Sequence, residues 1–109
     1  MEERSSLKPR RGPAGSSGRP LEVRWSSRAS RDIDRLAVDV PRVAAAVAEF
    51  VYGGLAQEPR RVGKPLRDEL VGMYSARRAE YRIVYQIDEA KDEVMIVRVG
   101  ARRTIYRPT

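Results

Sequence analysis

Four segments of the chain show the apolar patterns typical of β-strands. They are residues 21–25, 72–77, 80–87 and 93–99. In the third segment, Ile83 shares one face with the tyrosines two residues before and after it, so Arg82 must project from the other face. From Val94 to Val99 the last segment is apolar apart from Arg98, which predicts a strand in the centre of a sheet.

Two segments between the first and second strands have helical spacing instead. A serine cap at Ser26 or Ser27 begins the first helix, which is expected to end near Ala37. Its charged residues are predicted to face water, namely Arg28, Arg31, Asp32, Asp34 and Arg35.

The second helix is predicted to start from an Asp39 cap, with Pro41 in its first turn and an apolar stripe from Val43 to Val51. The glycine pair at 53–54 is expected to end it. Two helices joined by a short link predict a helical hairpin laid on the sheet.

Residues 55–70 contain two prolines and a glycine and show no sustained period, so we expect a loop that wraps the domain. The order of elements is then a strand, two helices and three strands joined mainly by hairpins. This order predicts the α+β class, with an N-terminal strand, a helical hairpin and a three-stranded antiparallel meander forming one mainly antiparallel sheet.

Composition adds a basic tail to this picture. Residues 1–20 are rich in Gly, Pro, Ser and Arg and offer almost nothing to bury, so they are expected to be a disordered tail before a domain at 21–109. A basic arm that helps to hold RNA, a solvated tail and a start codon assigned too early all fit this composition. The tail carries five basic and two acidic residues, which leaves +4 of the total +7 for the domain. A nucleic acid is the favoured partner, although an acidic protein would match the same charge.

The chain contains no Cys and no His, which excludes disulfides and thiolate chemistry and removes the usual zinc ligands and the commonest general base. No apolar run approaches the roughly 20 residues that span a bilayer, and no signal peptide is visible. We therefore expect a cytoplasmic protein with no membrane association.

An arginine within a strand is costly to place unless an anion receives it. Further basic residues and a phenol occur in segments that strand pairing would bring near Arg82; they are Arg77, Arg78, Arg102, Arg103 and Tyr106. Such a group suits the binding, and the cleavage, of a phosphodiester. Tyr74 and Tyr85 are expected to offer faces on which bases stack. The alternative is that Arg82 is a surface residue paired with Glu80 or Glu93.

The segment before the second strand carries a second group of cations. These are Arg60, Arg61, Lys64 and Arg67, which we interpret either as nucleic-acid contacts or as a solvated loop.

Three motifs taken together carry a more specific signal. Residues 72–87 contain Tyr-Arg-Ile-Val-Tyr, residues 96–106 end in Arg-Arg-Thr-Ile-Tyr, and Val-Gly-Lys-Pro-Leu at 62–66 precedes the second strand. Over residues 21–107 the chain resembles the RelE/ParE toxin superfamily, and its RelE branch most closely. The resemblance implies the toxin of a type II toxin–antitoxin system. Such a toxin is a ribosome-dependent endoribonuclease that cuts messenger RNA and is silenced by a cognate antitoxin.

In that family the 2′-hydroxyl of the RNA attacks the adjacent phosphate, so the resemblance implies no metal and no cofactor. Arg82 would stabilise the transition state, Arg102 would orient the phosphate or donate a proton, and Tyr106 would be a base or a stacking platform. Arg77 lies near a basic position of the family, whereas Ser75 occupies a position that is usually lysine, so one cation is missing. Arg78 is expected to compensate for it. The remaining RNA contacts are Arg60, Arg61, Lys64, Arg67 and Arg103.

Two alternatives from other functional classes stay open. One is a ParE-like toxin that inhibits DNA gyrase by binding protein, and the other is a non-catalytic basic module that binds RNA. Neither needs the combination of Arg82, Arg102 and Tyr106, and this combination favours the endoribonuclease.

Overall fold

The computed structural model describes residues 20–101. Residues 1–19 of the predicted tail at 1–20, and the predicted site residues Arg102, Arg103 and Tyr106, lie outside this range. The elements, in chain order, are β1 (Glu22–Trp25), α1 (Ser27–Asp39), α2 (Pro41–Phe50), the π-helical turn η2 (Val51–Leu55), α3 (Pro59–Val62), β2 (Lys64–Pro65), the 3-10 turn η3 (Asp68–Leu70), β3 (Tyr74–Arg78), β4 (Tyr81–Asp88) and β5 (Glu93–Ala101).

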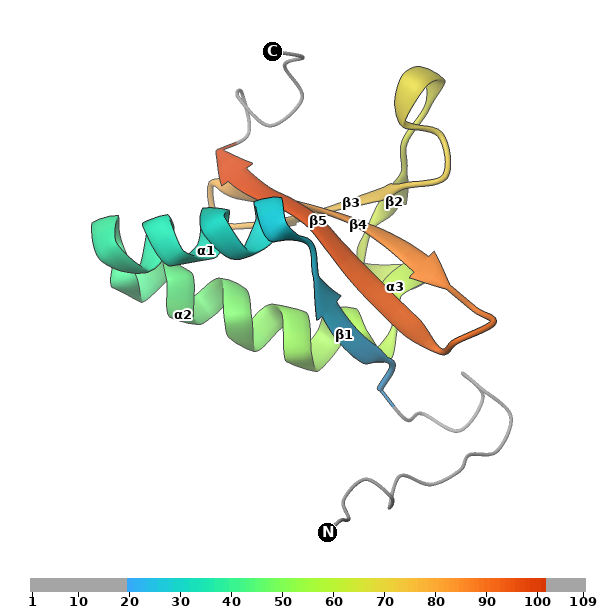
Figure 1. Ribbon diagram of the computed structural model, residues 1–109, viewed down its shortest axis with the longest axis horizontal. Helices are drawn as coiled ribbons and strands as arrows, with labels where there is room; N and C mark the ends of the chain where they lie inside the picture. The colour runs from blue at the N-terminus through green and yellow to red at the C-terminus, as the bar shows by residue number, and fades with distance from the viewer. Residues whose placement is uncertain (1–19, 102–109) are drawn as a thin grey trace, which may run out of the picture.

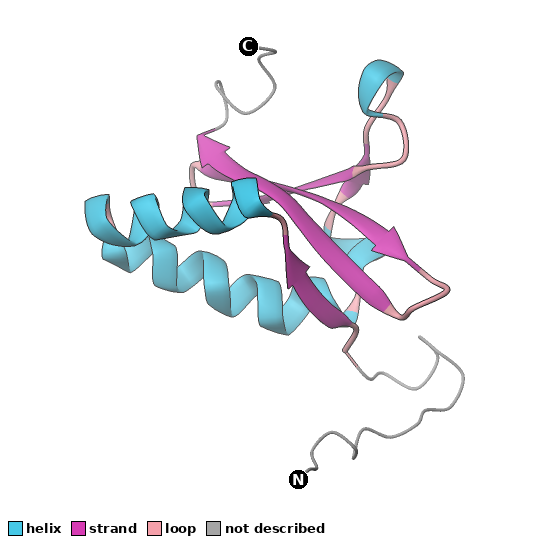
Figure 2. Ribbon diagram, viewed as in Figure 1, coloured by secondary structure: helices cyan, strands magenta, loops and turns pink. Residues whose placement is uncertain are grey.

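The strands form one twisted sheet in the order β1-β5-β4-β3-β2, and α1 and α2 lie together against one side of it (Figure 1). β3, β4 and β5 make the expected antiparallel meander, while β1 runs parallel to β5. The colouring by secondary structure separates the helical layer from the sheet (Figure 2). The predicted α+β class is confirmed. β5 is flanked on both sides, as its apolar sequence predicts, although β4 is the middle strand of the five.

The core lies between the helices and the sheet. It is built from side chains of α1, α2, η2 and the three long strands, with Ala29, Val47, Val51, Leu55, Ile83, Tyr85, Val94 and Ile96 fully buried. Ile83 and Tyr85 therefore face the helices, as their spacing predicts. Arg82 and Val84 lie on the other side of β4.

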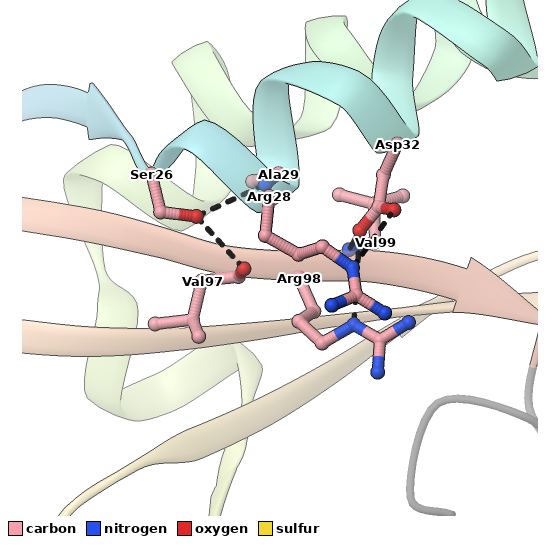
Figure 3. Close-up of polar contacts among 7 residues, drawn as sticks. All are labelled: Ser26, Arg28, Ala29, Asp32, Val97, Arg98 and Val99. Atoms are coloured by element: carbon pink, nitrogen blue, oxygen red, sulfur yellow. Dashed lines mark hydrogen bonds and ion pairs between the residues drawn. The ribbon is translucent and has the colours of Figure 1, made fainter. Parts of the chain in front are cut away.

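α1 covers the part of the β5 edge that no strand among residues 20–101 pairs. β1 ends at Trp25, opposite Ile96, and the chain turns there into α1. The Ser26 hydroxyl caps the helix by accepting a hydrogen bond from the Ala29 N–H, and it also donates to the Val97 carbonyl oxygen, each at 2.9 Å (Figure 3). Nearly two helical turns after the cap, an Asp32 carboxylate oxygen accepts a hydrogen bond from the Val99 N–H at 2.9 Å. Two polar side chains of α1 thus replace the missing strand.

Asp32 corrects the prediction that all the charged residues of α1 face water. Its side chain is only 16% exposed, because the carboxylate turns toward β5. A charged residue nearly two turns after a helix cap has no sequence signal for this role, since its partner is a backbone N–H far along the chain.

The second helix differs from the prediction at both ends. Val40 rather than Asp39 occupies the cap position and makes no side-chain capping bond, so Pro41 alone marks the start. At the other end the glycine pair lies inside η2, and helical backbone continues to Gln57. Burial of Leu55 and Ala56 favours this extra turn, because apolar residues beyond the glycines gain by remaining on the helical face.

Residues 58–70 are more regular than the loop that the sequence suggests. They form α3, the short strand β2 and the turn η3. Each element is only two to four residues long, which is too short for a periodic pattern to become visible.

We predict that Asp32→Ala lowers the free energy of unfolding by about 1–3 kcal/mol, because the Val99 N–H loses its acceptor. Asp32→Asn keeps an oxygen at the same place and should lose clearly less. Urea-induced unfolding followed by circular dichroism measures both variants. Equal losses would show that the charge of Asp32, rather than its hydrogen bond, holds α1 to β5.

Candidate functional site

The side of the sheet that faces away from the helices carries the predicted arginine. We call this side the outer face, and strand register defines its members because directly paired residues share a face. One row across the sheet is Lys64, Ser75, Val84 and Arg98, and the next row is Arg77, Arg82 and Gly100. These two rows of the outer face therefore gather four cations from β2, β3, β4 and β5.

Arg82 is the partly buried member of this group. Its Nη1 lies 3.4 Å from the Ser75 hydroxyl oxygen, and Ser75 itself is only 5% exposed. Arg77 pairs directly with Arg82 across β3 and β4. Like charges directly opposite each other on a sheet are destabilising. An anion bound between these two guanidinium groups would remove that repulsion, and phosphate oxygens match the guanidinium fork.

The alternative interpretation, in which Arg82 pairs with Glu93, is not what the structure shows. Glu93 instead faces Arg24, with the Arg24 Nη1 3.4 Å from a carboxylate oxygen. The register explains this choice, because Glu93 lies at the far end of β5, beside Glu22 and Asp88.

Arg98 is a member of the outer face that sequence reasoning missed. It interrupts an apolar run and was interpreted only as part of a buried strand. Its position opposite Val84 makes it a diagonal neighbour of Arg82, with backbones about 7–8 Å apart. The signal was available, because a single charged residue in an otherwise apolar central strand needs a polar partner or a ligand.

Lys64, which was predicted only as one cation of a loop, lies at a defined position of the sheet. It pairs with Ser75, the residue at which the family resemblance implies a missing lysine. A cation therefore lies beside this position, contributed by the neighbouring strand.

Four of the predicted RNA contacts lie outside these two rows of the outer face. Arg78 pairs with Tyr81 and projects to the helix side, so it does not compensate at Ser75. Arg60 forms an ion pair with Glu89, and Arg61 forms one with Glu58 at 3.0 Å. Arg67 precedes η3 and is exposed.

The predicted stacking role of two tyrosines is wrong for Tyr85 and unsupported for Tyr74. Tyr85 is fully buried in the core, where its hydroxyl donates a hydrogen bond to the Pro59 carbonyl oxygen. Burial raises the pKa of the Tyr85 phenol far above its ordinary value, and nearby Tyr74 raises it further. Tyr74 stacks on Tyr85 at a ring separation of 5.7 Å and packs against the same core. Neither ring lies on the outer face.

Gly63 holds the loop before β2 against this tyrosine. An added Cβ at Gly63 would overlap the Tyr85 hydroxyl and lie 2.8 Å from the Ser75 carbonyl oxygen. The glycine therefore allows the backbone approach that brings Lys64 beside Ser75.

In the part of the chain that the structure describes, no three or more His, Cys, Asp or Glu side chains gather in a way that could hold a metal ion. No helix among residues 20–101 is long and apolar enough to cross a bilayer.

Comparisons with known proteins give one consistent family. Residues 23–106 match the model of the ParE toxin of the type II toxin–antitoxin system parDE. The chain is 51% identical to the toxin RelG of Mycobacterium tuberculosis over 88 residues, which cover 81% of this chain and 98% of RelG. It is 44% identical to the toxin RelE of the same organism over 92 residues, covering 84% of this chain and 92% of that toxin. The crystal structure of the toxin–antitoxin complex RelBE2 from M. tuberculosis contains a chain with a TM-score of 0.71 and 51% identity, covering 76% of this chain and 92% of that one.

Gly63→Ala should lower the free energy of unfolding by about 1–3 kcal/mol, because the new methyl group overpacks the Tyr85 pocket. Gly53→Ala is the matched control: a Cβ there meets nothing within 4 Å, so this variant should be neutral or slightly stabilising. In a double-mutant cycle, Tyr85→Phe should relieve part of the Gly63→Ala loss. Additive losses in the cycle would show that the Ser75 carbonyl oxygen, and not the phenol, limits the space.

Proposed function

Because the chain belongs to the RelE/ParE toxin superfamily and is the toxin of a type II toxin–antitoxin system, we propose that it cleaves messenger RNA in a ribosome-dependent reaction on its outer face. The observation that carries the proposal is the placement of Arg82. It lies partly buried beside Ser75, directly opposite Arg77 and diagonal to Arg98, on the side of the sheet away from the helices.

The proposed reaction uses a nucleophile that the RNA supplies. The 2′-oxygen forms a bond to the adjacent phosphorus, the bond from phosphorus to the 5′-oxygen breaks, and a cyclic phosphate remains. A base takes the proton of the 2′-hydroxyl, and an acid gives one to the leaving 5′-oxygen. Negative charge accumulates on the phosphate oxygens in between, so fixed cations around them lower the barrier. The reaction uses no metal and no cofactor.

Arg82 and Arg77 are placed to hold the two sides of the phosphate in this reaction, and Lys64 supplies a cation next to Ser75. Lys64 also adds a group that can exchange a proton, which arginine cannot do at neutral pH. Arg102 and Tyr106 keep their proposed roles as proton donor or phosphate ligand and as base or stacking platform. They follow β5, whose last described residue, Ala101, pairs with Tyr81 next to Arg82.

The proposal includes a cognate antitoxin as the physiological partner and the cytoplasm, where ribosomes translate, as the place of action. RelBE2 is a toxin–antitoxin complex, and its structure contains a chain similar to this one. Four cations on one face predict that an acidic segment of the antitoxin covers it, because charge complementarity speeds association and neutralises the groups that the RNA needs.

Inhibition of DNA gyrase is the weaker candidate. The family model is named for ParE. The two relatives are named toxin RelG and toxin RelE, and the match covers 98% and 92% of their lengths. A supercoiling assay with purified gyrase distinguishes the two functions, and we expect no inhibition.

Arg82→Ala should lower the rate of messenger cleavage on translating ribosomes by about 10²–10³, the usual cost of removing one group that stabilises a developing oxyanion. Primer extension on a reporter messenger in a purified translation system measures the rate. Circular dichroism of the variant must match the unsubstituted protein, so that a loss of fold is not mistaken for a loss of chemistry. Cleavage at the original rate by a folded variant would exclude Arg82 from the site.

Neighbouring arginines of β3 provide a second test with a built-in control. Arg77 faces the outer side and Arg78 the helix side of the same strand end, and both are exposed. Arg77→Ala should lower cleavage at least tenfold, whereas Arg78→Ala should lower it less than threefold. Single-turnover cleavage at saturating ribosome concentration makes the comparison. Equal losses in the two variants would mean that total charge, rather than position on the outer face, governs the reaction.

A further inference from the structure

A second group of cations lies along α1 and meets the proposed cleavage site at Arg98. Arg28, Arg31, Arg35 and Arg98 surround Asp32 and line a hollow of about 370 Å³, and we call these five residues the α1 cluster. The three helix arginines occur at i, i+3 and i+7, so they form one stripe along α1. Arg28 and Arg98 converge on Asp32 from the helix and from β5 (Figure 3).

We propose that the α1 cluster binds a phosphodiester of RNA, at a distance from the phosphate that is cleaved. This inference rests on the proposed function and extends it with a second point of attachment. The ligand is a backbone phosphate, which either the messenger strand or ribosomal RNA can present.

The charges of the cluster do not cancel. Four guanidinium groups surround one carboxylate, and that carboxylate already accepts a hydrogen bond from the Val99 N–H. The Nε atoms of Arg28 and Arg98 each lie 3.8 Å from it, which is too far for a hydrogen bond. Asp32 therefore orients the two guanidinium groups without occupying their N–H donors. Within residues 20–101, Arg31 and Arg35 have no acidic partner within 4 Å.

A larger hollow in the same molecule is lined by equal numbers of positive and negative side chains, in contrast to the α1 cluster. It measures about 700 Å³ and is lined by three cations and three carboxylates, namely Arg24, Arg60, Lys91, Asp88, Glu89 and Glu93. Arg24 pairs with Glu93 and Arg60 pairs with Glu89. Its charges balance, so size alone would select the wrong hollow for an anion.

All the cations of the cluster are arginines, whose planar fork matches the oxygens of a phosphate as well as those of a carboxylate. The position of Arg98 favours the phosphates of a nucleic acid. Arg98 belongs both to the cluster and to the outer face, where it is a diagonal neighbour of Arg82. A strand bound at Arg82 therefore has a continuous path of positive charge toward α1, which suits a chain with a charge on every nucleotide.

The test compares the full chain carrying Arg31→Ala and Arg35→Ala with the unsubstituted protein and with Arg42→Ala. Arg42 is an exposed helix arginine outside the hollow, with no ion pair to residues 20–101, so it controls for loss of surface charge. The first probe is a fluorescent single-stranded RNA with 2′-O-methyl groups, which cannot be cleaved. The second probe is a ribosome without messenger, with binding measured by co-sedimentation.

Loss of two phosphate contacts should reduce the slope of log affinity against log salt by about 1.4 for the single strand, while Arg42→Ala leaves it unchanged. A reduced slope on the oligonucleotide identifies the messenger as the source of the phosphate. Weaker binding to the empty ribosome alone identifies ribosomal RNA. Either result supports the proposal.

Unchanged binding in both arms would overturn the inference. So would a variant that retains both RNA affinities but binds poly-glutamate more weakly, because the cluster would then be a site for an acidic protein. These measurements need no cleavage, so they remain valid if the proposed endoribonuclease activity fails. Conversely, a failed cleavage assay together with the expected reduction of the salt slope in the Arg31→Ala, Arg35→Ala variant would reject the activity and keep the binding site.

Discussion

The hydrogen bond from the Val99 N–H to Asp32 completes an edge that the sheet itself leaves open. β1 pairs with β5 only as far as Ile96, and an unpaired strand edge exposes backbone groups that need partners. Ser26 and Asp32 supply those partners from the first turns of α1. As a consequence α1 lies along β5 and not elsewhere on the sheet. The arginine stripe of the helix is thereby carried to the border of the outer face.

The two sides of the sheet follow opposite physical rules. Toward the helices, apolar side chains and the hydrogen-bonded phenol of Tyr85 fill the space. On the outer face, Arg77 and Arg82 oppose each other directly and Arg98 lies diagonally to Arg82. Such repulsion costs stability, and an anion bound between the two guanidinium groups would offset it. Arg98 also pairs with Asp32 of α1, and Arg24 pairs with Glu93 toward the other end of β5.

Sequence patterns predicted the class of the fold and the face of Arg82, because both depend on local periodicity. The alternation around Ile83 is confirmed by its complete burial, and the helices begin close to their expected residues. What the patterns could not supply were pairings between distant residues. Asp32 looked like any solvated helix charge, and Tyr85 looked like a stacking platform until Pro59 and Gly63 were seen beside it.

The same limit applies to the site. Arg82 and Arg77 could be placed from strand alternation, whereas the roles of Lys64 and Arg98 depend on register across four strands. Register is set by turns and bulges, and β4 and β5 slip by one residue between Val84 and Tyr85. Arg78 was expected to compensate for the missing lysine at Ser75, but alternation along β3 places it on the helix side. A shift of one residue moves a cation to the other side of the sheet.

The parallel pairing of β1 with β5 also affects the time at which the outer face forms. Ser26 and Val97, which meet at the corner of β1 and α1, are 71 residues apart in the chain. Contacts at such separations form late, because a long loop must close before they contribute. Among the strands of residues 20–101, β5, which supplies Arg98 and borders β4, is also the last to leave the ribosome during synthesis. A nascent chain therefore lacks the assembled outer face until β5 has emerged.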